Sequence, residues 1–400
     1  MTRFLTLFPL LLFALLVGGV TPARAQSGET GLTPGASRSS VLCLPGIYLD
    51  DPVDCTPAGP SDYLTGMARR GLVLPLAPLP ASRPDPALAE TGFRYGLVRT
   101  ANAPVYGSLD DALQNRKKNA IYTISSGFTY ISYLAEHYVD DKRFYEVEPG
   151  AFMTANDVIR IGAIPRMQGL IFSRTPSHAF GWVMSYLHPG PGPLETKRTP
   201  GTAQADYTGH VLTELEVVPV YATETVGEEE WYMVGPDEWV PGKVIARVLP
   251  NPTPPEGVTN DRWIEVNLYE QTLAVYDQRR LVFATLVATG LEPLWTRPGL
   301  FQVYQKLDTT PMRGAGDDGT SLAYYLEDVP FTMYFDKARA IHGAYWRTKL
   351  GFAQSHGCVN LTIGDAHWLF NWAQDGEWVY VWDPSGKTPT DPSFYGEGGA

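Results

Sequence analysis

Cysteine and paired metal-binding motifs are scarce in this sequence. It contains only three cysteines among 400 residues, with no Cys-x-x-Cys pair and no His-Glu-x-x-His motif. Structural zinc sites usually take four ligands from such closely spaced pairs. The sequence therefore predicts no metal site, including one built from Cys358 and its neighbouring histidines, and it indicates no cofactor.

Positive charge is also in short supply. Lys and Arg number 31 against 43 Asp and Glu, which gives a formal net charge of -12. Nucleic acids and anionic membrane surfaces attract basic proteins. This balance argues against either of them as the main partner.

Long apolar runs are absent except at the N-terminus. Arg3 is followed by an apolar stretch from residue 4 to 20 and then by Ala23-Arg24-Ala25. This order is typical of a cleaved export signal. An uncleaved anchor is the alternative, although the run is near the short end of the roughly 17 to 25 residues that span a bilayer. We predict a signal peptide over residues 1–25, no later membrane span, and an exported protein of the cell envelope, in the periplasm or cell wall.

The next segment, residues 26–91, is rich in Pro and Gly. Residues 26–40 resemble a flexible tether, and the prolines of residues 41–91 favour extended backbone over helix. Cys43 and Cys55 flank a short part of it and can form a disulfide in an oxidising compartment. That pairing leaves Cys358 as a free thiol.

A weak internal repeat lies between residues 92 and 250. The aromatic segment 144–147 aligns with 231–234, and residues 152–153 and 158–161 align with 239–240 and 245–248 at the same offset. A further match of residues 103–106 with 218–221 places a longer insertion in the first copy. Short aromatic strands in this order resemble bacterial SH3-like modules of exported cell-wall proteins. We predict SH3-like β-barrel modules at 92–165 and 166–250, which either bind the wall or support the next domain.

A second domain type follows the proline-rich linker at 251–260. Alternating apolar and polar residues predict strands at 263–268, 272–276, 281–289, 297–303, 321–335 and 377–382. The Gly/Asp segment 313–319 is expected to be a loop, and residues 364–374 have helical spacing. The expected fold is mainly β, with one short helix in a domain over 261–383 and a C-terminal tail at 384–400.

The chemistry is concentrated in residues 341–361. Cys358 is a candidate nucleophile, and His342 can act as its base if the two segments lie on adjacent strands. His356 is too close in sequence for an easy side-chain contact with the thiol, so we expect it to act through position or substrate contact. Ser355 and Gly357 place the thiol in a tight turn, whose backbone N–H groups can stabilise an oxyanion. The backbone at Gly343 leaves space for a carbonyl that holds the other nitrogen of His342.

These residues resemble the signature of the L,D-transpeptidase catalytic domain, also called the YkuD domain. The resemblance rests on His342-Gly343 and, a dozen residues later, Ser355-His356-Gly357-Cys358-Val359-Asn360. The segments 265–276, 296–301 and 329–335 also resemble strands of that family. Arg297 stands where proline is common, and Asn360 where many members have arginine.

The resemblance implies a cysteine acyltransferase that acts on peptidoglycan stem peptides. Cys358 would displace the terminal D-alanine of a tetrapeptide to form a thioester, which a neighbouring stem's amine would convert to a 3-3 cross-link. Contacts with substrate are expected from Tyr324, Tyr334, Trp346 and Asn360. Two alternatives stay open: the same thioester can be hydrolysed, as in an L,D-carboxypeptidase, or the protein can be a wall-binding protein without activity.

Overall fold

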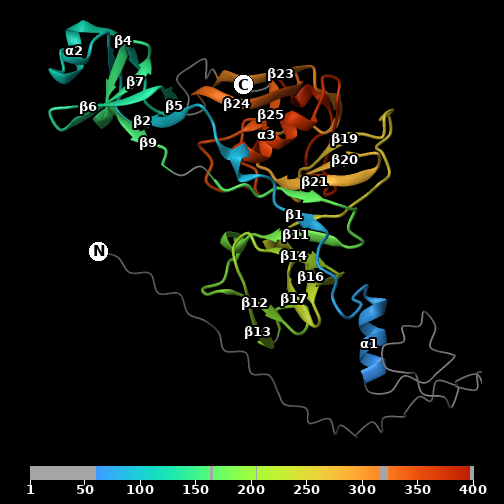
Figure 1. The fold of residues 1–400 in the computed structure, drawn as a ribbon. Helices are drawn as coiled ribbons and strands as arrows, with labels where there is room; N and C mark the ends of the chain where they lie inside the picture. The colour runs from blue at the N-terminus through green and yellow to red at the C-terminus, as the bar shows by residue number, and fades with distance from the viewer. Residues whose placement is uncertain (1–59, 163–164, 204, 315–322, 397–400) are drawn as a thin grey trace, which may run out of the picture.

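A computed structural model describes residues 60–162, 165–203, 205–314 and 323–396 (Figure 1). The expected signal peptide and the Cys43–Cys55 disulfide lie outside these residues. Within the expected tether, helix α1 (Pro60–Arg69) contradicts the prediction of extended backbone. Met67 and Leu72 pack against Trp231 and Trp239 there, so tertiary contacts outweigh the local proline content. The segment continues through β1 (Ala81–Ser82) and the 3₁₀ helix η2 (Pro86–Ala89).

The first repeat consists of eight strands. They are β2 (Arg94–Val98), β3 (Ala103–Tyr106), β4 (Ala120–Ile124), β5 (Phe128–Tyr133), β6 (Ala135–Val139), β7 (Lys142–Glu148), β8 (Ala151–Thr154) and β9 (Val158–Arg160). Helix α2 (Leu109–Leu113) and the 3₁₀ helices η3 (Lys117–Asn119) and η4 (Ala155–Asp157) connect them. Buried side chains from several of these strands, among them Val105, Ile131 and Tyr145, form the repeat's own core.

The second repeat has a matching set of strands. They are β11 (Ala179–Val183), β12 (Leu194–Lys197), β13 (Tyr207–Leu212), β14 (Val217–Val220), β15 (Ala222–Val226), β16 (Glu229–Gly235), β17 (Glu238–Pro241) and β18 (Ile245–Val248). The 3₁₀ helices η5 (Ser185–Leu187) and η6 (Gly242–Val244) lie between them. The predicted repeat is therefore confirmed as a duplication, while its SH3-like character stays a prediction.

Strand pairing defines how the two copies correspond. The pairs β2·β5, β2·β9, β3·β4, β3·β8, β6·β7 and β7·β8 recur as β11·β14, β11·β18, β12·β13, β12·β17, β15·β16 and β16·β17. The predicted match of residues 103–106 with 218–221 is wrong, because β3 corresponds to β12 and β14 corresponds to β5. The match that sequence comparison missed joins Tyr95-Gly96-Leu97-Val98 to Phe180-Gly181-Trp182-Val183.

The expected catalytic domain contributes strands to two sheets. One has the order β1-β10-β21-β20-β19-β27-β22 and contains β19 (Trp263–Asn267), β20 (Thr272–Asp277), β21 (Arg280–Leu286), β22 (Gly299–Gln302) and β27 (Trp378–Trp382). Its strand β10 (Leu170–Phe172) comes from the segment expected to open the second module. Residues 170–172 instead extend the catalytic sheet, because they pair with β21.

The other sheet joins the catalytic domain to the first repeat. Its order is β26-β25-β24-β5-β2-β9, with β24 (Tyr324–Asp336), β25 (Arg339–Gly343) and β26 (Val359–Leu361), and β23 (Gln305–Gly314) pairs with β24. Strand β23 was not predicted, and residues 313–314 of the expected loop belong to it. Strand β5 lies parallel to β24, with Phe128 opposite Tyr324 and Tyr130 opposite Leu326. In Figure 1 the first repeat extends outward from this edge.

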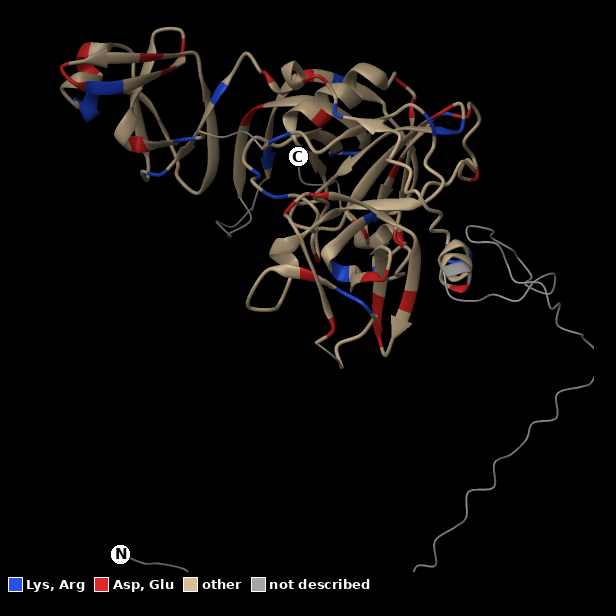
Figure 2. Cartoon of the chain, turned by 60° about the horizontal axis from the view of Figure 1, so that its bottom comes forward, with Lys and Arg blue, Asp and Glu red and all other residues tan. Residues whose placement is uncertain are grey.

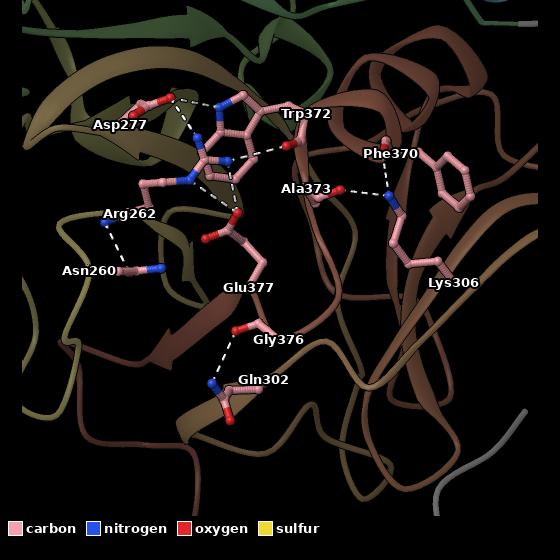
Figure 3. Close-up of polar contacts among 10 residues, drawn as sticks. All are labelled: Asn260, Arg262, Asp277, Gln302, Lys306, Phe370, Trp372, Ala373, Gly376 and Glu377. Carbon is pink, nitrogen blue, oxygen red and sulfur yellow. Dashed lines mark hydrogen bonds and ion pairs between the residues drawn. The ribbon is translucent and has the colours of Figure 1, made fainter.

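In the C-terminal domain, helix α3 (Ile363–Trp372) packs against β24 and β25, and the sequence predicted a helix here. Thr362 caps its N-terminus, and at its C-terminus Lys306 Nζ donates to the carbonyls of Phe370 at 2.7 Å and Ala373 at 2.6 Å (Figure 3). Arg262 bonds Asp277 and Glu377 and also donates to the Trp372 carbonyl. These contacts satisfy carbonyls that a helix end leaves without intrahelical partners.

The described part of the chain holds no helix long and apolar enough to cross a membrane. Acidic and basic residues are interspersed along the chain in both repeats and in the C-terminal domain (Figure 2). The short 3₁₀ helix η7 (Pro392–Phe394) precedes Tyr395, whose ring lies 5.2 Å from the guanidinium carbon of Arg339. The expected tail at 384–400 thus includes an ordered contact with the catalytic domain.

Candidate active site

The parallel pair β25·β26 brings the two key residues together. His342 is opposite Asn360 in this pair, and Cys358 directly precedes β26. His342 and Cys358 line one small cavity, and both are buried, at 1% and 5% exposure. Adjacent strands therefore place thiol and imidazole at one site although the sequence separates them.

The turn that carries Cys358 is fixed by hydrogen bonds. Ser355 Oγ donates to the Cys358 carbonyl at 2.6 Å and accepts the Gly357 N–H at 3.1 Å. Thr296 donates to the Gly357 carbonyl at 2.8 Å. Gly357 has φ +119°, a conformation that favours glycine, and a Cβ there would lie 3.2 Å from Arg339 Nε. Because Ser355 takes the Gly357 N–H, the oxyanion donors expected from this turn reduce to His356 and Cys358.

His342 is oriented by neutral partners on both ring nitrogens. Its Nδ1 lies 3.2 Å from the Gly343 carbonyl, and its Nε2 lies 3.2 Å from Asn360 Nδ2. The carbonyl can only accept, so Nδ1 carries the proton and Nε2 holds the lone pair. A side chain at position 343 would be crowded, since a Cβ would lie 3.1 Å from Pro330 Cγ and 3.2 Å from Ile363 Cα.

The thiol has its own backbone partners. Cys358 Sγ accepts the Ala340 N–H at 3.5 Å and faces the Ala338 carbonyl at 3.9 Å. Among the hydrogen bonds of the described residues, none joins Cys358 to His342. Direct proton transfer between them therefore requires the side chains to rearrange from these contacts.

Burial controls the charge of both groups. It raises the pKa of Cys358 to about 11 and lowers the pKa of His342 to about 4. Burial also lowers the pKa of His356, and the positive charge of Arg347 adds to that effect. The resting site at neutral pH thus contains a neutral thiol and a neutral imidazole.

The four predicted substrate-binding residues differ in whether they line the cavity. Trp346 and Tyr324 line the cavity; their rings lie 5.6 Å from His342 and 5.0 Å from His356. Tyr334 is not among the lining residues and stacks on Tyr304 instead. Asn360 lines the cavity, but its buried amide contacts the base. Sequence reasoning therefore placed three of the four on the cavity wall and missed the orienting contact of Asn360 with His342.

Four further lining residues were not predicted. The β23–β24 hairpin supplies Met312 and Leu326, the first repeat supplies Phe128, and Arg347 follows Trp346 in the chain. Phe128 could not be found from sequence, because only the β5·β24 pairing brings it here. Arg347 lay within the glycine-rich segment that was singled out, and its charge was the available signal.

The fold and this site define the class of the domain. Residues 261–381 match the family model of the L,D-transpeptidase catalytic domain, YkuD. This part of the chain is an L,D-transpeptidase catalytic domain, as its cysteine and histidine motifs indicated.

Solved structures of the same kind are similar to this chain. The catalytic domain from the E. faecium L,D-transpeptidase is 29% identical, with 32% of this chain and 100% of that chain covered and a TM-score of 0.28. A cysteine-to-serine mutant of the Enterococcus faecium L,D-transpeptidase is 24% identical, with 30% and 49% covered and a TM-score of 0.28. Mycobacterium tuberculosis L,D-transpeptidase 1 is 19% identical, with 30% and 60% covered and a TM-score of 0.26. The chain thus spans about half the length of the Enterococcus faecium protein. No curated protein sequence matches it.

Proposed function

We propose that this protein is an exported L,D-transpeptidase that forms 3-3 cross-links between peptidoglycan stem peptides through a thioester on Cys358. The observation that carries the proposal is the shared cavity of Cys358 and His342, with His342 held in one tautomer by Gly343 and Asn360. The N-terminal export pattern supports a location in the periplasm or cell wall. The duplicated strands support a role for the repeats as wall-binding or supporting modules.

In the acylation step, His342 accepts the thiol proton and the Cys358 sulfur attacks the carbonyl of the diamino acid. The His356 and Cys358 N–H groups are the donors proposed for the oxyanion. The carbon–nitrogen bond breaks, His342 returns the proton to the departing D-alanine amine, and a thioester remains. An amine from a second stem then attacks the thioester and transfers its proton to His342. As the new amide forms, the carbon–sulfur bond breaks and His342 returns the proton to the Cys358 thiolate.

The decisive experiment uses the chain from Gln26 onward with muropeptides that carry tetrapeptide stems. Mass spectrometry should detect the 3-3 dimer and free D-alanine with the wild type, and neither product with Cys358→Ala. If tripeptide were detected without any dimer, the reaction would be hydrolysis of the thioester and not cross-linking. Full activity in Cys358→Ala would refute the proposed mechanism.

A further inference from the structure

A half-buried cation lies in the catalytic cavity without a negative partner. Arg347 lines the cavity beside Cys358, and no Asp or Glu is among the lining residues. Among the described residues, no carboxylate forms an ion pair with Arg347. A charge removed from water is costly unless an opposite charge or several hydrogen bonds compensate it. This arrangement leaves the positive charge of Arg347 available to an anionic ligand.

The hydrogen bonds of Arg347 leave part of the guanidinium available. Nε lies 3.4 Å from Asn360 Oδ1, Nη1 donates to Gln354 Oε1 at 3.1 Å, and Nη2 donates to the Gln354 carbonyl at 2.6 Å. All three acceptors are neutral. Because a guanidinium has five N–H groups, one remains on each terminal nitrogen. Two N–H groups are the number that a carboxylate takes in a bidentate contact.

The position of Arg347 relates it to the reacting cysteine. Its partner Gln354 precedes Cys358 in the loop, and its partner Asn360 follows Cys358 in strand β26. Phe128 of the first repeat covers the guanidinium at 5.8 Å. The carboxylate of the departing residue lies one residue beyond the attacked carbonyl, a reach of about 3.5 Å. A cation in the same cavity can therefore contact it.

We propose that Arg347 binds the free C-terminal carboxylate of the donor stem peptide and thereby selects donors with a terminal D-amino acid in the acid form. The inference rests on the proposed transpeptidase function and specifies how its donor is chosen. Asn360 contacts both Arg347 and His342. One chain of hydrogen bonds would therefore hold the bound carboxylate and the base.

The first test compares a tetrapeptide donor with the same peptide as its C-terminal amide. The wild type should have a kcat/KM about 10- to 100-fold higher for the acid, the range expected for charge-assisted hydrogen bonds. Arg347→Gln should reduce this ratio to near unity, and Arg347→Lys should retain part of it. Arg279→Gln removes an equal charge from the exposed Arg279–Asp261 pair and should keep the wild-type ratio. An unchanged acid-to-amide ratio in Arg347→Gln would overturn the inference, even if both rates fell.

The second test does not depend on transpeptidase activity. Alkylation of Cys358 by iodoacetate and by neutral iodoacetamide compares an anionic with an uncharged reagent at the same sulfur. The iodoacetate-to-iodoacetamide rate ratio should fall about tenfold in Arg347→Gln and stay unchanged in Arg279→Gln. If the wild type turns over neither donor, the proposed function fails. The iodoacetate-to-iodoacetamide rate ratio then shows by itself whether Arg347 binds an anion beside Cys358. An equal ratio in wild type and Arg347→Gln would reject that site.

Discussion

At the residue scale, the neutral pair of Cys358 and His342 has a kinetic consequence. Thiolate, not thiol, is the nucleophile, and burial raises the pKa of Cys358 to about 11. We expect iodoacetamide alkylation of Cys358 to accelerate about tenfold per pH unit between about pH 7 and pH 10. Mass spectrometry of the Cys358 peptide measures the rate, with Cys358→Ala as the blank. A plateau near neutral pH would instead reveal a thiolate–imidazolium pair in the resting enzyme.

The charge of His342 depends on the neutral amide beside it. Burial lowers the pKa of His342 to about 4, and Asn360 adds no charge. In Asn360→Asp a carboxylate replaces the amide, so the pKa of His342 should rise. NMR titration of the imidazole measures this shift, with His342→Gln to assign the resonance. An unshifted titration would show that Asn360 does not contact the base in solution.

The candidate catalytic residues were easier to locate from sequence than the residues around them. Cys358, His342 and Ser355 are close in sequence to distinctive glycines, and one pair of adjacent strands suffices to assemble them. The direct thiol–imidazole contact could not be judged from sequence, because it depends on where Ala338 and Ala340 hold the sulfur. Phe128 enters from another domain, which no local pattern reveals.

At the element scale, helix α3 supports the cysteine loop and is held at its C-terminus by Lys306. Loss of its two hydrogen bonds to helix carbonyls in Lys306→Met should lower the free energy of unfolding by about 1 to 3 kcal/mol. Urea denaturation followed by tryptophan fluorescence measures the change. The exposed Lys118→Met is the matched control and should leave stability near the wild-type value. Equal stability of both variants would mean that water replaces Lys306 at no cost.

The strands show why short matches mislead. The aromatic segments of β7–β8 and β16–β17 keep the same spacing and the same register, including the irregularity after Glu146 and Met233. By contrast, the Pro-Val-Tyr segments come from strands that do not correspond. Small apolar segments suit any strand of a small β domain, so their similarity carries little positional information.

The glycine match is more specific because packing demands it. A Cβ at Gly96 would lie 2.3 Å from Val158, and one at Gly181 would lie 2.6 Å from Ile245. Each glycine occupies the same place in its repeat, where the neighbouring strand approaches closely. A glycine within an aromatic strand was therefore the stronger signal of the duplication.

At the scale of the whole molecule, the two copies of the repeat have different positions. The second packs Phe180 and Trp182 against Trp263 and Tyr276 of the catalytic sheet. The first instead pairs β5 with β24 and contributes Phe128 to the cavity. Duplication thus supplied one copy that supports the catalytic sheet and one that completes the wall of the site.

The junction between the first repeat and β24 contains a half-buried carboxyl group. Glu327 Oε2 accepts the Ser132 N–H at 2.8 Å, and Ser132 Oγ donates to Asp328. Burial raises the pKa of Glu327 to about 7. The folded junction therefore keeps this proton at a pH where the unfolded chain has released it. Its stabilising effect is complete below about pH 4.5 and is lost as the pH rises through about 7.

We expect the junction to open more readily at about pH 8 than at about pH 5. Hydrogen exchange of the β5 amides, corrected for the intrinsic pH dependence, should show lower protection at the higher pH. Glu327→Gln cannot ionise and should lose this dependence, whereas Glu228→Gln, in an exposed turn of the second repeat, should keep it. Because β5 carries Phe128, the same pH change should loosen one wall of the catalytic cavity. Equal protection of β5 at both pH values in the wild type would contradict this coupling.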